Sequence, residues 1–568
     1  MGKPIPIRNV AKAGIVVDQD PYDLSLQSLS YGQNLRCENG YFERGPVARS
    51  SGAPLPRDPK LALCFDYEPG VTRVHVVDEY GYVRDWSTSG QTDLSPTAGW
   101  TGSVSDAPVT TTVLADVVYV NRGDRQPWYR HKRAASSTPY ALLSSFNSGL
   151  GGAQFPSTLR FKSLRACAGL LVGIGVNDNG TALPTQVYWS DFADQDKPPR
   201  NWDTGGIVYN NAGETQSSVS GRNVLTEMKG SLIDGCPLGN NLVLYSSREA
   251  FLMSFVGGND VFTFSRLFDG GILGVNCVVE HEGRHFCFGE DDIFVHDGNT
   301  TKISIAQGRV RNHIYRNLVR SEAHHSFVAH NKSLNEILFA YCSNDRYTTF
   351  PYTPSGTDRG CNRAAVFNYA SNCWYFYDLP WVTSATFGQV VNGLTFSSVG
   401  SLTYDALGGS YASQGSLMAN ALLIASRTFK SPIDGSVQQP QLRSFGPPDD
   451  ANTSATLDIH ANGKMLAEKT RADFDELEFP IYGTKLFSHI DIQGQIAADA
   501  RPVLVTVGAS NHSTEEPMWG LTQTFDTKYS RIDCNQTGRY LAFKFEYDDY
   551  KSMRISSFDL DVQIVSPR

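Results

Sequence analysis

The feature that most constrains this chain is a repeat of short apolar runs separated by tight turns. Two successive stretches, 232–267 and 276–305, each carry four runs that end at Gly, Asn, Asp, Ser or Pro. At an offset of 43 residues three positions correspond: Tyr245 with Phe288, Glu249 with Asp292, and Phe251 with Phe294. The runs are too short for amphipathic helices and are rich in β-branched and aromatic residues, so they predict four strands per unit.

Weaker copies of this unit lie on both sides. Successive units start near residues 60, 109, 162, 232, 276 and 325. A period of about 40 to 50 residues with four strands per unit is typical of a β-propeller, whose closed ring leaves few sheet edges exposed. We therefore expect an all-β chain with a β-propeller of about six four-stranded blades over residues 56–425. The ring has to be closed, and either the N-terminal segment 1–55 or the stretch 385–425 would supply the closing strand or a seventh blade.

The pattern changes beyond residue 431, where the expected strands become longer and alternate between apolar and polar residues. Alternation of this kind is typical of strands with one buried face. We expect a C-terminal β-sandwich-like domain over residues 426–568, entered through the turn-rich stretch 446–450. The remaining segment, 1–55, is expected to be an N-terminal arm or a closing strand.

Composition excludes several classes of protein. Charged residues make up 19% and hydrophobic residues 40% of the chain, which excludes a disordered, collagenous or coiled-coil protein. The balance of 49 Lys and Arg against 58 Asp and Glu gives a net charge of −9 without a basic block, which disfavours binding to phosphates by counterion release. No apolar run is long enough to cross a membrane. The ten cysteines are scattered without a Cys-x-x-Cys pair, so we expect them to be reduced.

Two groups of histidines are candidates for metal ligands. His281 and His285 form one group, and His324, His325 and His330 form the other. On strands or across a tight turn, a separation of four residues does not by itself place two imidazoles on one ion. No carboxylate or cysteine pattern completes either group, so we expect surface or cross-strand histidines. The sequence predicts no metal site and no cofactor.

Acidic clusters at 290–292, 473–476 and 548–549 are candidates for calcium ligands or for a general acid and base. Each falls in an expected turn or edge, where Asp and Asn cap backbone groups, and this favours solvated turns. The Ser-x-Asp-x-Gly-x-Thr-Trp box of sialidase-type propellers is absent, and so is a Gly-x-Ser-x-Gly elbow. We therefore expect a protein that is not an enzyme.

A long polar insertion, 343–362, separates two expected strands of the last complete repeat. Its charged and aromatic residues make it a candidate gate or docking loop, because long insertions on a rigid scaffold often carry function. An ordinary surface loop is the competing interpretation. The candidate residues are Asp345, Arg346, Tyr347, Asp358 and Arg359.

Several phrases in order along the chain resemble the tail nozzle proteins, also called tail tubular protein B, of short-tailed bacteriophages. In the N-terminal part they are IPIR, DQDPYDL and NGYFERGP at 5–8, 18–24 and 39–46. Further on they are VYWSD, AAVFNYASNCWYFYDLP and GRYL at 187–191, 364–380 and 538–541. The likeness is spread over most of the chain, and its weight comes from the order of the phrases.

This resemblance implies a structural virion protein of the tail, assembled in the host cytoplasm. It implies a homo-hexamer below the portal and its adaptor, the head–tail connector protein, and an attachment point for a tail fibre or needle. The ring would be the distal conduit for double-stranded DNA, which passes without sequence recognition. A mildly acidic wall is compatible with this, because it repels phosphate. The alternatives are a carbohydrate-active, glycosidase-like propeller and a scaffold propeller that binds cellular proteins as a monomer.

Overall fold

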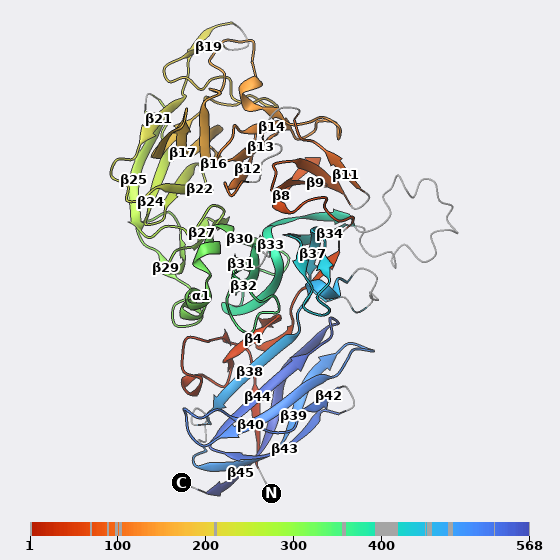
Figure 1. The fold of residues 1–568 in the computed structure, drawn as a ribbon. Coiled ribbons are helices and arrows are strands. Elements are labelled where there is room, and N and C mark those ends of the chain that lie inside the picture. The colour runs from red at the N-terminus through yellow and green to blue at the C-terminus, as the bar shows by residue number, and fades with distance from the viewer. Residues whose placement is uncertain are drawn as a thin grey trace, which may run out of the picture.

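The computed structural model divides the molecule into a β-propeller and a β-sandwich, with both chain termini at the far end of the sandwich (Figure 1). It describes residues 3–566 except 51, 69–70, 88–89, 97–99, 101–104, 210–212, 259, 355–358, 392–417, 449, 451–456, 475–480 and 527–528. Within this part of the chain, no helix is both long enough and apolar enough to cross a membrane.

Five antiparallel four-stranded sheets follow one another along the described chain, each with its strands in sequence order. In the third sheet a hairpin, β19 (Ile207–Tyr209) and β20 (Thr215–Ser217), is inserted before the last strand. The strands of the five sheets are β8 (Pro59–Glu68), β9 (Val71–Asp78), β10 (Val83–Ser87) and β11 (Gly90–Asp93); β12 (Val109–Leu114), β13 (Val117–Arg122), β14 (Trp128–His131) and β15 (Ala141–Leu142); β16 (Leu159–Cys167), β17 (Leu170–Asp178), β18 (Thr181–Trp189) and β21 (Gly221–Val224); β22 (Leu232–Leu238), β23 (Asn241–Ser246), β24 (Glu249–Phe255) and β25 (Phe262–Asp269); β26 (Val278–His281), β27 (Arg284–Phe288), β28 (Ile293–His296) and β29 (Ile303–Ser304).

Local turn chemistry fixes these hairpins. The turn between β26 and β27 consists of Glu282 and Gly283, which have φ angles of 50° and 72°. Two consecutive residues with positive φ are what a type I′ hairpin turn requires, and this turn follows the right-handed twist of the strands. The pair Ala168 and Gly169 does the same between β16 and β17.

The sixth and seventh blades share one continuous sheet. Its strands, in order, are β30 (Phe327–Asn331), β31 (Glu336–Tyr341), β32 (Cys361–Asn368), β33 (Cys373–Val391), β34 (Met418–Ser426), β37 (Gln441–Gly446) and β7 (Val47–Ser50). The first part of β33 pairs with β32, and the part beyond Val382 pairs with β34. Trp381, with a φ of 53°, lies at the change of partner. The long strand β33 is therefore the last strand of blade six and the first strand of blade seven.

The first strands of the seven blades surround a central channel. Residues of β8, β12, β16, β22, β26, β30 and the second part of β33 line it together. The expected propeller fold is confirmed by this arrangement, and the expected count of about six blades becomes seven. Both candidate closing segments take part, because β34 begins within the stretch 385–425 and β7 lies within the segment 1–55.

The C-terminal domain is a sandwich of two sheets. One sheet contains β43 (Arg531–Gly538), β39 (Thr484–Ile496), β45 (Met553–Ser566), β6 (Tyr41–Arg44) and β5 (Leu35–Glu38), with β1 (Lys3–Arg8) paired to β45. The other contains β4 (Tyr31–Gln33), β38 (Met465–Ala472), β44 (Tyr540–Tyr547), β40 (Val503–Ser510) and β41 (Met518–Trp519), with β42 (Gln523–Phe525) paired to β40. Phe543 and Phe558 pack edge to face between the sheets, with ring centroids 5.1 Å apart.

The domain boundaries differ from those expected at 55 and 426. β37 pairs with β34 and so belongs to the propeller, whereas the sandwich begins near β38. The N-terminal segment is not a separate arm, because β1, β4, β5 and β6 lie in the sandwich while β7 lies in the propeller. The smaller elements are β2 (Gly14–Ile15), β3 (Ser28–Leu29), β35 (Phe429–Lys430), β36 (Val437–Gln438), α1 (Arg311–Asn317) and the 3₁₀ helices η1 (Pro21–Asp23), η2 (Leu143–Ser145), η3 (Arg320–His325) and η5 (Ile459–Ala461).

Candidate functional site

The central channel is the first place where a propeller would bind a ligand or act on one. Its cavity volume is about 240 Å³. The lining contains Thr111 on β12, the hydroxyls of Thr383, Ser384 and Thr386 on β33, and apolar residues of β8 and β30.

A buried ion pair crosses the channel lining. Arg165 donates to both carboxylate oxygens of Asp234, at 2.9 Å from Nε and 2.6 Å from Nη2. The carboxylate also accepts hydrogen bonds from the Ser163 hydroxyl and from the backbone N–H groups of Gly235 and Asn276. We call Ser163, Arg165, Asp234 and Asn276 the channel cluster. It joins three consecutive blades, because its members lie on β16, on β22 and just before β26.

The electrostatics of the channel cluster are those of a structural pair. Burial acts to raise the pKa of Asp234, but Arg165 and the hydrogen bonds to the carboxylate hold that pKa below its ordinary value. Arg165 also donates to the backbone carbonyl of Thr111 and to the side-chain oxygen of Asn276. Both carboxylate oxygens of Asp234 and all three guanidinium nitrogens of Arg165 are therefore hydrogen-bonded within the described chain, as in a structural ion pair.

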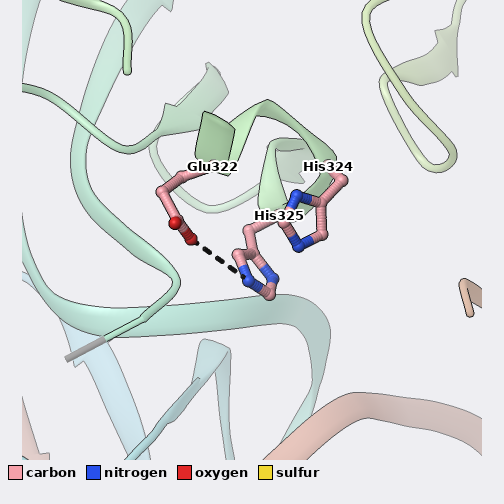
Figure 2. Close-up of side chains that lie close together, drawn as sticks. All are labelled: Glu322, His324 and His325. Atoms are coloured by element: carbon pink, nitrogen blue, oxygen red, sulfur yellow. Dashed lines mark ion pairs between the residues drawn. The ribbon is translucent and has the colours of Figure 1, made fainter. Parts of the chain in front are cut away.

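The predicted histidine groups separate in the structure. His285 is buried and takes part in a hydrogen-bond chain with Tyr245, whereas His281 and His330 stack against each other and against Tyr369. Burial lowers the pKa of His330 to about 4. His324 and His325 lie in η3 instead, beside a carboxylate that the sequence argument did not use, that of Glu322 (Figure 2).

The chain through Tyr245 has a defined direction. Nε2 of His285 lies 2.9 Å from the carbonyl of Pro237, which can only accept, so Nδ1 of His285 accepts from the hydroxyl of Tyr245 at 2.7 Å. The backbone N–H of Gly298 donates to Nδ1 of His296, so Nε2 of His296 donates to the same hydroxyl at 2.6 Å. The chain links the fourth and fifth blades.

The predicted gate or docking loop is anchored to the rest of the chain at one end. Asp345 is buried, with its carboxylate 3.0 Å from Nε2 of His313 and 3.4 Å from Nη1 of Arg363. Tyr347 packs against Tyr31 of β4 with ring centroids 4.5 Å apart. Arg346 is exposed and donates to the hydroxyl of Tyr347 at 2.6 Å. In this structure the first part of the insertion therefore joins the propeller to the sandwich.

The other two predicted loop residues have no such role in the described chain. Arg359 is exposed, and its positive charge lies near His325. Asp358 lies outside the described residues. Whether any part of the insertion acts as a gate stays a prediction.

A second buried charge cluster lies where the propeller meets the sandwich. We call Tyr31, Asp345, Arg363 and Asp378 the joint cluster. Arg363 donates to the hydroxyl of Tyr31 at 2.7 Å, but its Nη1 lies 3.4 Å and 3.6 Å from the two carboxylates. Its Nε and Nη1, and one oxygen of Asp378, are buried without a hydrogen bond.

The pKa values of the two carboxylates of the joint cluster shift in opposite directions. Burial acts to raise the pKa of Asp345, but His313 and Arg363 together lower it to about 2. Burial dominates at Asp378 and raises its pKa, even though Arg363, Thr349 and Asn34 act in the other direction. Arg363 therefore faces both carboxylates, at 3.4 Å from Asp345 and 3.6 Å from Asp378.

Sequence reasoning missed a neighbouring group at this joint. Glu336 accepts hydrogen bonds from the hydroxyls of Tyr375 and Tyr377 at 2.8 Å and 2.7 Å, and it lies 3.3 Å from Nε of Arg36 on β5. Burial raises its pKa to about 7, although Arg36 and the hydroxyls act to lower it. From the sequence, Glu336 is expected in a strand beside a turn, and no local pattern predicts its contact with Arg36.

A pocket of about 690 Å³ opens between the two domains. Tyr347 and Thr349 line it from the insertion, and Lys464, Arg501 and Tyr550 line it from the sandwich. The acidic pair 548–549 also reaches it. Both carboxylates are engaged by Arg501, one by its backbone N–H at 2.8 Å and one by Nη1 at 3.4 Å.

One edge of the sandwich exposes large apolar side chains. β41 is an edge strand that pairs with β40, and the exposed fractions of Met518, Trp519 and Leu521 are 73%, 39% and 87%. We call these three residues the β41 patch. Exposed apolar side chains that gather at a sheet edge mark a contact surface more often than scattered ones do.

Comparisons with known proteins identify no family. The sequence matches no family model and no curated protein. Among solved structures, the chain is similar to the WD40 β-propeller domain of Doa1, with 10% identity and a TM-score of 0.34 over 72% of this chain and 100% of that chain. It is also similar to BBS1N in its complex with ARL6DN, with 10% identity and a TM-score of 0.34 over 73% of this chain and 99% of that chain.

Proposed function

We propose that this protein is a structural virion protein that forms the tail nozzle of a short-tailed bacteriophage. Six copies would surround the axis through which genomic DNA leaves. Besides the sequence resemblance, the observation that carries this proposal is the channel of the propeller, with its volume of about 240 Å³ and its Arg165–Asp234 pair. A DNA duplex is wider than its major groove, which alone measures about 12 Å. A channel with a volume of only about 240 Å³ is too small for an object of that width, so a duplex does not fit through one chain. A conduit would have to lie between copies.

The way the domains are joined supports a load-bearing role. The N-terminal segment contributes four strands to the sandwich and then β7 to the seventh blade. The chain returns to the sandwich after β37, so it connects the two domains twice. β1 also pairs with β45 near the C-terminus. A subunit held together in this way would keep its shape while DNA passes. Its net charge of −9 would repel phosphate, so the duplex would slide without sequence recognition.

In this proposal the β41 patch contacts the neighbouring copy in the ring. The portal adaptor would dock on one end of the ring and a tail fibre or needle on the other. The protein would assemble in the host cytoplasm and remain in the tail of the virion. It would not be an enzyme.

The test measures the mass of the purified chain in solution, alone and with candidate portal and adaptor proteins, followed by negative-stain imaging. We expect sixfold rings, either alone or on the adaptor. Leu521→Asp should prevent ring formation, while Ile303→Asp, at a residue 69% exposed on β29, should not. A chain that stays monomeric with every partner overturns the nozzle proposal. Rings formed equally well by Leu521→Asp overturn only the role of the β41 patch.

The pocket between the domains favours a carbohydrate-active propeller as the second candidate. Aromatic rings of Tyr347 and Tyr550 together with Asp548 and Asp549 are residue types that bind and cleave sugars. Under this reading the chain would cleave glycans as a monomer, and Asp548→Asn or Asp549→Asn would abolish cleavage. A glycan screen without any cleavage would reject it.

A further inference from the structure

Three possible metal ligands lie on one short helix. Glu322, His324 and His325 belong to η3, which ends just before the first strand of blade six. Each offers one ligand atom, and these atoms lie within 4.8 Å of one another (Figure 2). A 3₁₀ helix has three residues per turn, so Glu322 and His325 lie on the same face. In a strand, residues three positions apart point to opposite faces, so the expected strands did not predict this contact.

The contact between Glu322 and His325 is unexplained by hydrogen bonding. Oε2 of Glu322 and Nε2 of His325 lie 3.5 Å apart, and both atoms are buried without a hydrogen-bond partner. A cation between the two atoms would satisfy both of them.

His324 is oriented as a ligand would be. Its Nδ1 lies 3.1 Å from the backbone carbonyl of Ser321, which can only accept, so Nδ1 carries the proton and Nε2 has a free lone pair. A metal-binding histidine typically donates its other ring N–H to a carbonyl or carboxylate in this way. The rings of His324 and His325 lie 4.0 Å apart between centroids.

The geometry fits zinc. With bonds of about 2.0–2.1 Å, adjacent ligand atoms of a tetrahedral zinc ion are roughly 3.4 Å apart, close to the 3.5 Å between Glu322 and His325. The other ligand atoms lie up to 4.8 Å apart, and the exposed His324 would move toward Glu322 and His325 when the ion binds. We propose that Glu322, His324 and His325 form a zinc(II) site with an open fourth position.

The charges around the site specify the fourth ligand. Arg427, Lys60 and Arg359 all lie near His325. Arg427 is already paired with Asp58 and Glu79, at 3.1 Å and 3.0 Å. One carboxylate and two neutral imidazoles leave a bound zinc ion with a net positive charge, and the neighbouring cations add to it. The fourth ligand is therefore an anion, such as hydroxide, chloride or a carboxylate.

The test uses the full chain, with Co²⁺ as a spectroscopic probe and Zn²⁺ in a competition titration. We expect one Co²⁺ per chain with the intense visible absorption of a tetrahedral ion, displaced by Zn²⁺. Glu322→Gln and His324→Gln should each weaken Zn²⁺ binding at least about tenfold. The matched control is His512→Gln, at an exposed histidine of the sandwich.

Circular dichroism of each variant shows whether it is folded. His324 is exposed, so His324→Gln is the variant expected to leave the fold unchanged. A six-coordinate Co²⁺ spectrum, or Zn²⁺ binding by a folded His324→Gln variant that equals that of the unaltered chain, overturns the proposal.

Discussion

The channel cluster and the joint cluster each bury one arginine with carboxylates, but they differ in how completely the charges are satisfied. Arg165 binds Asp234 through two hydrogen bonds of 2.9 Å and 2.6 Å. Arg363 lies 3.4 Å and 3.6 Å from two carboxylates, and its Nε and Nη1 make no hydrogen bond. A bidentate pair gives both energy and geometric specificity. The arginine of the channel cluster is therefore held in a fixed geometry across three blades, while the arginine of the joint cluster is held less tightly by its carboxylates.

The sharpest test of this comparison is to remove the carboxylate of the channel cluster. Asp234→Ala leaves the mostly buried Arg165 without a counter-charge, which we expect to lower the free energy of unfolding by about 3–5 kcal/mol. Urea unfolding, followed by intrinsic fluorescence, measures the loss.

The control for this variant replaces both partners by apolar residues. Arg165→Met combined with Asp234→Leu removes the charges together, and such replacements are often close to neutral. We expect most of the lost stability to return. A loss below about 1 kcal/mol for Asp234→Ala alone would mean that the pair does not tie the blades.

The second test uses Glu336, which faces Arg36, Asn331, Tyr375 and Tyr377. Its folded pKa of about 7 lies above the ordinary value of 4.5, so the folded state binds the proton more tightly than the unfolded state. The stability that this group contributes is complete below about pH 4.5 and is lost as the pH rises through 7.

The shift corresponds to about 2–3 kcal/mol between pH 4.5 and pH 8. Glu336→Gln is neutral at every pH, so we expect its unfolding free energy to vary less over this range than that of the unaltered chain. Urea midpoints measured every half pH unit give the difference. Parallel pH profiles for the two proteins would show that Glu336 does not titrate there.

The propeller could be predicted from sequence because its signal is local and repeated. The offset of 43 residues relates consecutive blades, and the turn at Glu282 and Gly283 appears in the hairpin where it was expected. The sequence leaves open whether the closing segments form one strand or a seventh blade, since β7 pairs with β37 almost 400 residues further on. The domain boundary could not be predicted, because the pairing of β37 with β34 is not visible in the composition.

The surroundings of two site residues could not be predicted for the same reason. Asp345 was expected in a loop because its neighbours are polar, but strand β4 of the N-terminal segment covers it through Tyr31. The sequence did not predict Glu322 as a possible ligand, because its segment forms a 3₁₀ helix rather than a strand. Burial that depends on distant parts of the chain decides both cases, and no local pattern encodes it.

The third test compares the two arginines directly by conservative replacement. Arg165→Lys loses the planar fork that binds both oxygens of Asp234, so we expect a loss of about 2 kcal/mol in the free energy of unfolding. Arg363→Lys exchanges carboxylate contacts that are already long, and an ammonium group can still donate to the hydroxyl of Tyr31, so we expect a loss below about 1 kcal/mol. Denaturant unfolding of both variants under one condition gives the comparison. Equal losses would mean that the looser geometry at the joint has no energetic meaning.

The smallest expected effect concerns a hydrogen bond between blades. Tyr245→Phe removes the hydroxyl that donates to His285 and accepts from His296, which leaves two buried ring nitrogens without partners. We expect a loss of about 1–2 kcal/mol, measured as a lower urea midpoint. Tyr119 on β13 is the matched control, because it is equally buried but its hydroxyl makes no hydrogen bond. Tyr119→Phe should therefore be neutral or slightly stabilising. If both variants lose the same stability, the chain through Tyr245 adds nothing beyond the packing of its ring, and the contrast between the propeller and the joint rests on the channel cluster alone.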